Sequence, residues 1–231
     1  MKISIRGPIV SSNQHRFYQW YGLEATSPKS VTDALAGGNG ERAEVEINSG
    51  GGEIFAASEI YTALRNYAGG VHIRIVGLAA SAASIIAMAG ESEMTPTGMM
   101  MIHNVQTSAD GDYRQMEHTA GVLRDANHAI SSAYIAKTGR TEQEIAAMMD
   151  AETWVTAGRA VELGLIDRVM AMDSGQKPLA ADFYSGMLSE DALRRAENLI
   201  KDQTGGPGFF MPERAEAEAK FKFLKLKGEW K

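Results

Sequence analysis

The 231-residue sequence contains no cysteine, which excludes disulfide bonds, thiolate metal sites and a cysteine nucleophile. It has no histidine pair at metal-binding spacing and no His-Glu-x-x-His motif, so we expect no metal ion or other cofactor. Basic residues are outnumbered by acidic ones. The resulting net charge of −6 argues against general binding to nucleic acids.

Long hydrophobic runs are also missing. The longest apolar stretch surrounds Ser81, and it is too short and too rich in serine to span a bilayer. Residues 1–7 alternate between apolar and polar, which is typical of a strand and not of the core of a signal peptide. We therefore expect a soluble, cytoplasmic protein with no nucleic-acid or membrane partner.

Hydrophobic residues make up 44% of the chain, and they recur with strand and helix periods in turn. This alternation predicts an α/β fold with largely parallel strands. A change of character near Asp173 predicts one domain over residues 1–172 and a partly helical, mobile C-terminal extension over residues 173–231. The expected strands are residues 3–5, 44–48, 71–76, 99–103 and 165–169; the expected helices are residues 14–24, 30–35, 85–89 and 112–137, one through residues 60–67, and two capped by Thr141 and Thr156.

The most informative stretch is residues 71–84. A β-type run leads through Gly77 to Ser81, which sits among alanines, and an apolar helix follows. This order presents a serine nucleophile at the start of a helix, where free backbone N–H groups can stabilise an oxyanion. A serine in such a place is also a common helix cap or packing residue. Ser84, one turn further on, is expected to pack inside.

A second strand, residues 44–48, leads into the glycine-rich segment 49–52. Glycines allow a close backbone approach to a ligand, and no Gly-Lys-Ser/Thr follows to make a phosphate loop. An oxyanion hole needs two donors from different backbone segments. The amides of Gly51 and Ala82 are the candidate pair.

His103 is the candidate general base. Of the five histidines, it alone ends a strand soon after the Ser81 helix, where loops line a cleft. A lone histidine at a strand end is more often structural. An acid must also orient the imidazole, and Asp150 and Glu152 both lie between two expected helices. Spacing alone does not choose between them.

Four segments follow one another in a characteristic order, namely residues 47–52, 77–82, 101–104 and 160–167. They resemble the motifs of the Clp protease proteolytic subunit (ClpP) family, over roughly residues 1 to 170. The chain is most similar to the ClpP-like proteases of phages and prophages, some of which act in head maturation.

The resemblance implies a crotonase-like spiral of ββα units with a protruding strand–helix handle. It implies a serine endopeptidase with Ser81 as nucleophile, His103 as base, and the Gly51 and Ala82 amides as oxyanion hole. Counting back from the aromatic residue at 154 selects Glu152 as the acid, where the family has aspartate, and leaves Asp150 as runner-up.

The resemblance also implies peptide or protein substrates and a homo-oligomer, commonly a heptameric ring that is single or stacked in pairs. The axial segment with which the family contacts an AAA+ unfoldase has no counterpart before the first strand, and residues after 173 have none in the typical subunit. An unfoldase and a phage capsid or scaffold protein are the candidate partners. Two alternatives stay open: a crotonase-type acyl-CoA enzyme, which would not need His103, and an inactive shell or scaffold protein.

Overall fold

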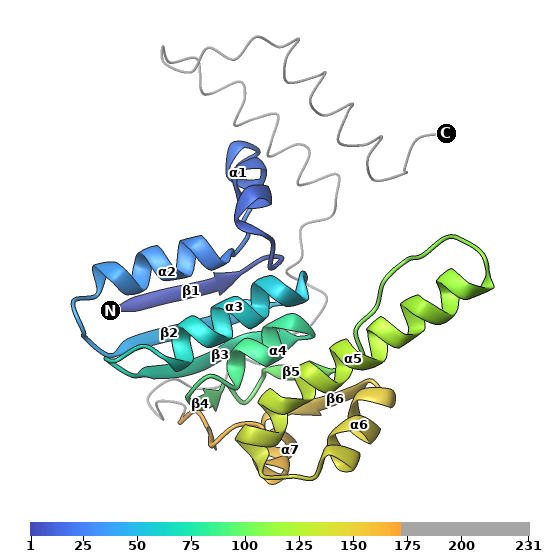
Figure 1. Cartoon of the computed structure of the whole chain (residues 1–231). Helices are drawn as coiled ribbons and strands as arrows, with labels where there is room; N and C mark the ends of the chain where they lie inside the picture. Colours follow the sequence, from blue (N-terminus) through green and yellow to red (C-terminus); the bar gives the residue numbers. More distant parts are fainter. Residues whose placement is uncertain (172–231) are drawn as a thin grey trace, which may run out of the picture. The chain divides into compact units, whose positions relative to one another are not determined.

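The computed structural model describes residues 1–171, which lie within one compact unit (Figure 1). The predicted extension, residues 173–231, falls outside these described residues. None of the helices formed by residues 1–171 combines the length and the apolar character needed to cross a membrane.

The elements are β1 (Lys2–Arg6), α1 (Ser12–Trp20), α2 (Pro28–Gly37), β2 (Ala43–Ser49), α3 (Ile54–Arg65), β3 (Val71–Ala80), α4 (Ala82–Ala87), β4 (Glu91–Met94), β5 (Met99–Ile102), α5 (Tyr113–Thr138), α6 (Glu142–Asp150), β6 (Thr153–Thr156), α7 (Ala157–Leu163) and β7 (Arg168–Val169).

The sheet is built mainly from parallel strands in the order β1-β2-β3-β4-β7, which confirms the predicted α/β fold. Helices α2, α3 and α4 cover one face of it (Figure 1). Alternate strand residues point to this face and are almost completely buried, because branched side chains pack well on a pleated surface. These residues are Ile3, Ile5, Val45, Ile47, Ile73 and Ile75.

The opposite face of the sheet carries a ladder of charged side chains. Arg74 Nε lies 3.0 Å from Glu93, and Arg168 reaches both Glu93 and Glu91. Hydrogen bonds from Arg168 and Arg42 lower the pKa of Glu91 to about 2. A slip of one residue in strand pairing would turn these charges into the core, so the ladder helps to fix the register.

Strand β3 is shared between two neighbours, and the change takes place at Gly77. Residues 72–75 pair with β4, whereas residues 78–80 pair with β5. The Leu78 N–H donates to Asn48 Oδ1 at 3.0 Å, and a Cβ on Gly77 would come within 2.5 Å of the same oxygen. Glycine therefore lets Asn48 approach where the strand changes partner, and β3 delivers Ser81 beside the end of β5.

Helices α1 and α2 begin earlier than the sequence pattern predicts. Ser11 caps α1, so this helix starts at residue 12 and ends at Trp20 instead of residue 24. Helix α2 begins after Ser27 and not after Ser30, with Pro28 in its first turn. Ser27 and Ser30 form a reciprocal capping box, which makes Ser30 the third helical residue and not the cap.

The starts of α5, α6 and α7 agree with the prediction, whereas α4 covers Ala82–Ala87 and not residues 85–89. Asp112 caps α5, and Gly139 ends it with a left-handed φ of 69°. Thr141, the predicted cap of α6, forms a capping box with Glu144. Thr156 precedes α7, although its side chain makes no capping hydrogen bond, and Gly164 closes that helix.

The structure contains two strands that the sequence did not predict, and one predicted strand is shorter than expected. β4 and β6 have four residues each and no clear alternation, and β6 pairs antiparallel with β5. The last strand covers only β7, not residues 165–169, because Leu165 and Ile166 are buried in the preceding turn. Residues 103–112 form no strand, since this polar segment has no strand neighbour within the described chain; the handle is therefore a loop and α5.

Asp167 joins the end of α5 to the sheet. Its Oδ2 accepts hydrogen bonds from Lys137 Nζ at 2.5 Å, from the Ser92 N–H at 2.7 Å and from Ser92 Oγ at 3.1 Å. Lys137 also donates to the Gly90 carbonyl. Burial alone would raise the pKa of Asp167, but these hydrogen bonds outweigh it and hold the pKa below its usual value.

We expect Asp167→Asn to lower the free energy of unfolding by about 1–2 kcal/mol near neutral pH, because a half-exposed, charge-assisted hydrogen-bond centre is lost. A depressed pKa contributes stability above the unfolded value of about 3.9, and that contribution is lost as the pH falls through the folded value. The difference between the two proteins should therefore shrink in urea titrations run below about pH 4. Asp33→Asn, which breaks only the exposed Lys29 pair, should change little. A difference that stays constant with pH would contradict this account.

Candidate active site

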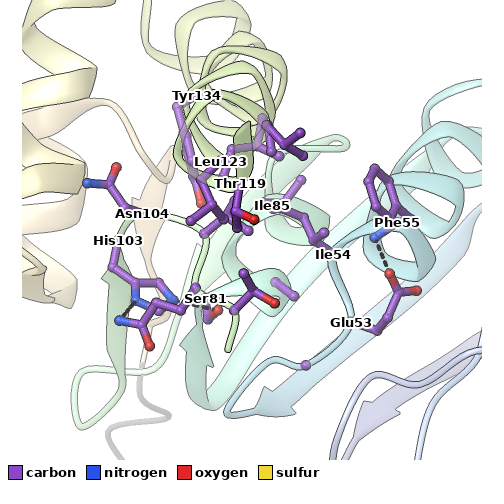
Figure 2. Close-up of a pocket in the computed structure, with 18 residues that line it drawn as sticks. Glu53, Ile54, Phe55, Ser81, Ile85, His103, Asn104, Thr119, Leu123 and Tyr134 are labelled. Carbon is purple, nitrogen blue, oxygen red and sulfur yellow. Dashed lines mark hydrogen bonds between the residues drawn. The ribbon is translucent and has the colours of Figure 1, made fainter. Parts of the chain in front are cut away.

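Ser81 lies in a strained turn between β3 and α4. Its φ of 54° and ψ of −126° fall in a region that residues with a Cβ avoid. The Ser81 N–H donates to the Met101 carbonyl at 2.9 Å, and the Ser81 carbonyl accepts from Ser84 N–H at 2.9 Å and from Ser84 Oγ at 2.6 Å. These hydrogen bonds hold the turn and leave Ser81 Oγ free to face the cavity (Figure 2).

His103 reaches Ser81 because β3 and β5 are neighbouring parallel strands. Ala80 pairs with Met101, so the residues that follow the two strands lie side by side. His103 Nε2 is 2.7 Å from Ser81 Oγ (Figure 2). The structure thus brings two predicted site residues within hydrogen-bond distance, and a neutral imidazole with its lone pair on Nε2 can take the serine proton.

Ser84 is fully buried, which confirms that it is a packing residue. Because Ser84 Oγ donates to the Ser81 carbonyl, the Tyr134 hydroxyl 2.7 Å away must donate to Ser84 Oγ. Burial raises the pKa of Tyr134 well above its ordinary value, so this hydroxyl remains a donor. A chain of hydrogen bonds from α5 therefore fixes the carbonyl of the serine turn.

The glycine segment lies directly against the serine turn. A Cβ on Gly51 would come within 2.7 Å of Ser81 Cβ and 3.0 Å of the Ala82 nitrogen. However, the Gly51 N–H donates to Ser49 Oγ at 3.1 Å. The Gly52 N–H has no acceptor within residues 1–171, and Gly52 lines the cavity with Ser81 and Ala82.

The Gly52 peptide is held on both sides by the chain that follows β1. The Ile9 N–H donates to the Gly51 carbonyl at 2.9 Å, and the Glu53 N–H donates to the Ile9 carbonyl at 2.8 Å. A Cβ on Gly52 would come within 2.1 Å of that same Ile9 carbonyl. Gly52 is a site residue that sequence reasoning missed, although the three adjacent glycines offered a signal for it.

The two candidate acids are exposed, and neither forms a hydrogen bond or ion pair with His103 in the described part of the chain. Asp150 accepts from Asn104 Nδ2 at 2.8 Å, and Glu152 accepts from Trp154 Nε1 at 3.3 Å. The atom that lies next to His103 Nδ1 is the side-chain amide nitrogen of Gln106, at 3.4 Å. The role of Glu152 as the acid, with Asp150 as runner-up, stays a prediction, and no sequence signal pointed to Gln106.

A cavity of about 570 Å³ opens beside Ser81 and His103 between α3, α4 and α5 (Figure 2). Most of its wall is hydrophobic, so an apolar side chain bound next to Ser81 would be removed from water. The apolar residues of the wall include Ile54, Phe55, Ile85, Val122, Leu123 and Ile130.

The histidines and carboxylates of residues 1–171 form no metal-binding cluster. No cluster of three or more His, Asp or Glu side chains there could hold a metal ion. His118 and His128 are exposed on α5, and His128 pairs with Glu142. His72 contacts Arg168 on the charged face of the sheet.

Comparison with known proteins gives a consistent family likeness. The Clp protease family model matches residues 35–173. Two curated relatives, both named ATP-dependent Clp protease proteolytic subunit, come from Bacteroides fragilis strains ATCC 25285 and YCH46. Each is 29% identical over 134 residues, which is 57% of this chain and 65% or 61% of the relative. The aligned region thus spans less than two thirds of these relatives.

We expect Ser81→Gly to be more stable than Ser81→Ala by about 1 kcal/mol, because glycine adopts the positive φ of this turn without steric cost. Urea denaturation of the two variants measures the difference. Ser58 in α3 provides the matched control, since there glycine should be less stable than alanine by about 0.5–1 kcal/mol. The same order of stability at both positions would argue against strain at Ser81.

Proposed function

The chain belongs to the Clp protease family, and from this premise we propose that it is a serine endopeptidase. The observation that carries the proposal is the 2.7 Å contact between His103 Nε2 and Ser81 Oγ at the mouth of an apolar cavity. A strained serine at a strand-to-helix turn with a histidine at hydrogen-bond distance is the arrangement that activates a serine nucleophile.

In the proposed reaction, Ser81 Oγ attacks the carbonyl carbon of a peptide bond while His103 Nε2 takes its proton. The tetrahedral intermediate collapses with cleavage of the C–N bond, and His103 returns the proton to the departing amine. Water then attacks the acyl-enzyme by the same route, with His103 again acting as the base, and Ser81 is regenerated.

The negatively charged oxygen of the tetrahedral intermediate is stabilised by two hydrogen-bond donors. The amide of Ala82 is the first of α4, where no intrahelical acceptor exists. We propose that its partner is Gly52 and not the predicted Gly51, because the Gly51 N–H is already bonded to Ser49. Gly52 and Ala82 both line the cavity beside Ser81.

The hydrophobic wall of the cavity supports preference for a large apolar residue on the acyl side of the cleaved bond. We expect Leu123→Asp to lower kcat/KM for peptides with leucine or phenylalanine there by at least about tenfold. Arg124→Asp is the matched control, because Arg124 neighbours Leu123 but does not line the cavity. Equal cleavage after charged and apolar residues by the unmodified protein would contradict the assignment.

The likeness to Clp proteolytic subunits also supports a homo-oligomeric ring acting on peptides or proteins. Exposed apolar side chains that could join subunits or partners occur on and beside α1, namely Phe17, Trp20 and Leu23. An AAA+ unfoldase, or a phage capsid or scaffold protein as substrate in head maturation, stays our proposed partner. A cytoplasmic location is part of the same proposal.

Covalent labelling with a fluorophosphonate tests the catalytic proposal. We expect an adduct on Ser81, mapped by mass spectrometry, together with peptide hydrolysis. Both should be lost in Ser81→Ala and fall by at least about 10²-fold in His103→Ala, because the serine then lacks its base. Circular dichroism should remain unchanged in these variants.

Ser58→Ala, at an exposed serine of α3 that makes no contact with the serine turn, serves as the matched control, since the protein should still be labelled on Ser81. Hydrolysis that survives in Ser81→Ala would overturn the proposal. The crotonase-type alternative predicts acyl-CoA binding that does not need His103, whereas an inactive shell or scaffold would assemble without any labelling.

A further inference from the structure

We infer that Tyr134 is a positioning residue of the proposed oxyanion hole, because it orients the amide of Ala82 by way of Ser84. The inference rests on the proposed function, in which the Ala82 N–H stabilises the tetrahedral oxygen. The Ser81 carbonyl and the Ala82 N–H belong to one planar peptide unit, so a contact that fixes the carbonyl also fixes the direction of the N–H. The hydrogen bonds at this carbonyl therefore determine where the proposed donor points.

Two buried hydroxyl groups connect this peptide to α5. The Ser81 carbonyl accepts hydrogen bonds from the Ser84 N–H at 2.9 Å and from Ser84 Oγ at 2.6 Å. The Tyr134 hydroxyl lies 2.7 Å from Ser84 Oγ. Ser84 is 0% exposed and Tyr134 is 1% exposed, so bulk water does not compete for either hydroxyl.

Tyr134 decides where the hydroxyl hydrogen of Ser84 points. A serine hydroxyl has a single hydrogen, which rotates to suit its surroundings. A hydrogen bond donated by Tyr134 occupies a lone pair of Ser84 Oγ and leaves the hydrogen of Ser84 for the Ser81 carbonyl. Hydrogen bonds in series polarise one another in a buried site, so a carbonyl that accepts from this chain makes the N–H of its own peptide a better donor. The chain therefore both orients and strengthens the Ala82 N–H.

The position of Tyr134 is fixed by the end of α5, from which its side chain extends beside the cavity (Figure 2). Lys137, three residues later, is bonded to Asp167 and so ties this end of α5 to the sheet. On the other side of the turn, the Ser81 N–H donates to the Met101 carbonyl of β5 at 2.9 Å. The peptides before and after Ser81 are thus held by different elements, which is the condition under which a strained backbone persists.

The direct test is the ¹³C chemical shift of the Ser81 carbonyl, which moves downfield when the carbonyl accepts a hydrogen bond. The full chain, labelled with ¹³C-carbonyl serine and ¹⁵N-alanine, gives correlations only from its three Ser-Ala steps, which begin at Ser81, Ser108 and Ser132. Magic-angle-spinning NMR detects them whatever the size of an oligomer, and Ala82→Gly identifies the Ser81 signal by its loss. We expect Tyr134→Phe to move this signal upfield and to leave the Ser108 signal in place.

Two further variants test whether the hydroxyl groups act in series. Ser84→Ala should move the Ser81 signal at least as far, and Tyr134→Phe should add nothing in that background. Tyr61→Phe is the matched control, because it removes the hydroxyl of a half-buried tyrosine on α3 that does not line the cavity, and it should change nothing. An unchanged Ser81 signal in Tyr134→Phe would overturn the inference.

Kinetics give the second readout. We expect Tyr134→Phe to lower kcat for peptide hydrolysis by about tenfold with little change in KM, because the oxyanion forms only after the substrate has bound, and the retained ring still lines the cavity. A role in packing alone predicts a lower free energy of unfolding with an unchanged kcat, and that result would contradict the inference.

The NMR readout does not depend on hydrolysis, so the two proposals can fail separately. The expected carbonyl shift in Tyr134→Phe, combined with an unmodified protein that neither hydrolyses peptides nor reacts with the fluorophosphonate, would count against the proposed function and would support the hydrogen-bond chain. Hydrolysis and labelling at Ser81 without the carbonyl shift would count against the role of Tyr134 alone.

Discussion

The pairing of the last residues of β3 with β5 is the contact on which the candidate site depends. Strand β3 begins beside β4 and ends beside β5, and this change of partner leaves Ala80 opposite Met101. Ser81 and His103 follow these paired residues, so two side chains 22 positions apart meet without any long flexible connection. Gly77 and Asn48 make the change possible, because the glycine leaves room for the amide that supports the strand. The precision of the site is therefore a property of the sheet and not of its loops.

The sequence was informative where a local rule applies. The alternation of apolar residues predicted β1 and β2, the helical period predicted the limits of α5, and the capping residue Thr141 predicted the start of α6. The sequence did not predict β4 and β6, because their pairing depends on residues far away in the chain. These segments become strands only by pairing with the edges of β3 and β5. Ser81 and His103 were found because both follow strands. Which glycine amide is free could not be predicted, since it depends on the Ser49 hydroxyl and on the backbone hydrogen bonds between Ile9 and residues 51 and 53.

The surroundings of His103 illustrate the same limit. Asp150 and Glu152 looked equivalent in the sequence because both lie in one short connection, yet each meets a different neutral partner. The contact of Asp150 with Asn104 joins α6 to the loop after β5, and Val105 in that loop is bound to α5, so these partners are far apart in the chain. The family likeness predicts an acidic side chain next to the His103 imidazole. The packing of α5 and α6 determines which side chain lies there in the structure.

The backbone at Ser81 also narrows the chemical identity of the nucleophile. At a φ of 54° the Cβ is already crowded, and a second heavy atom on it would meet the following peptide. Threonine is consequently a poor substitute here even though its hydroxyl could react in the same way. The backbone conformation at residue 81 thus favours a side chain that is not branched at Cβ, whatever its reactivity. Serine is the hydroxyl-bearing residue that meets this condition and also reaches the imidazole of His103.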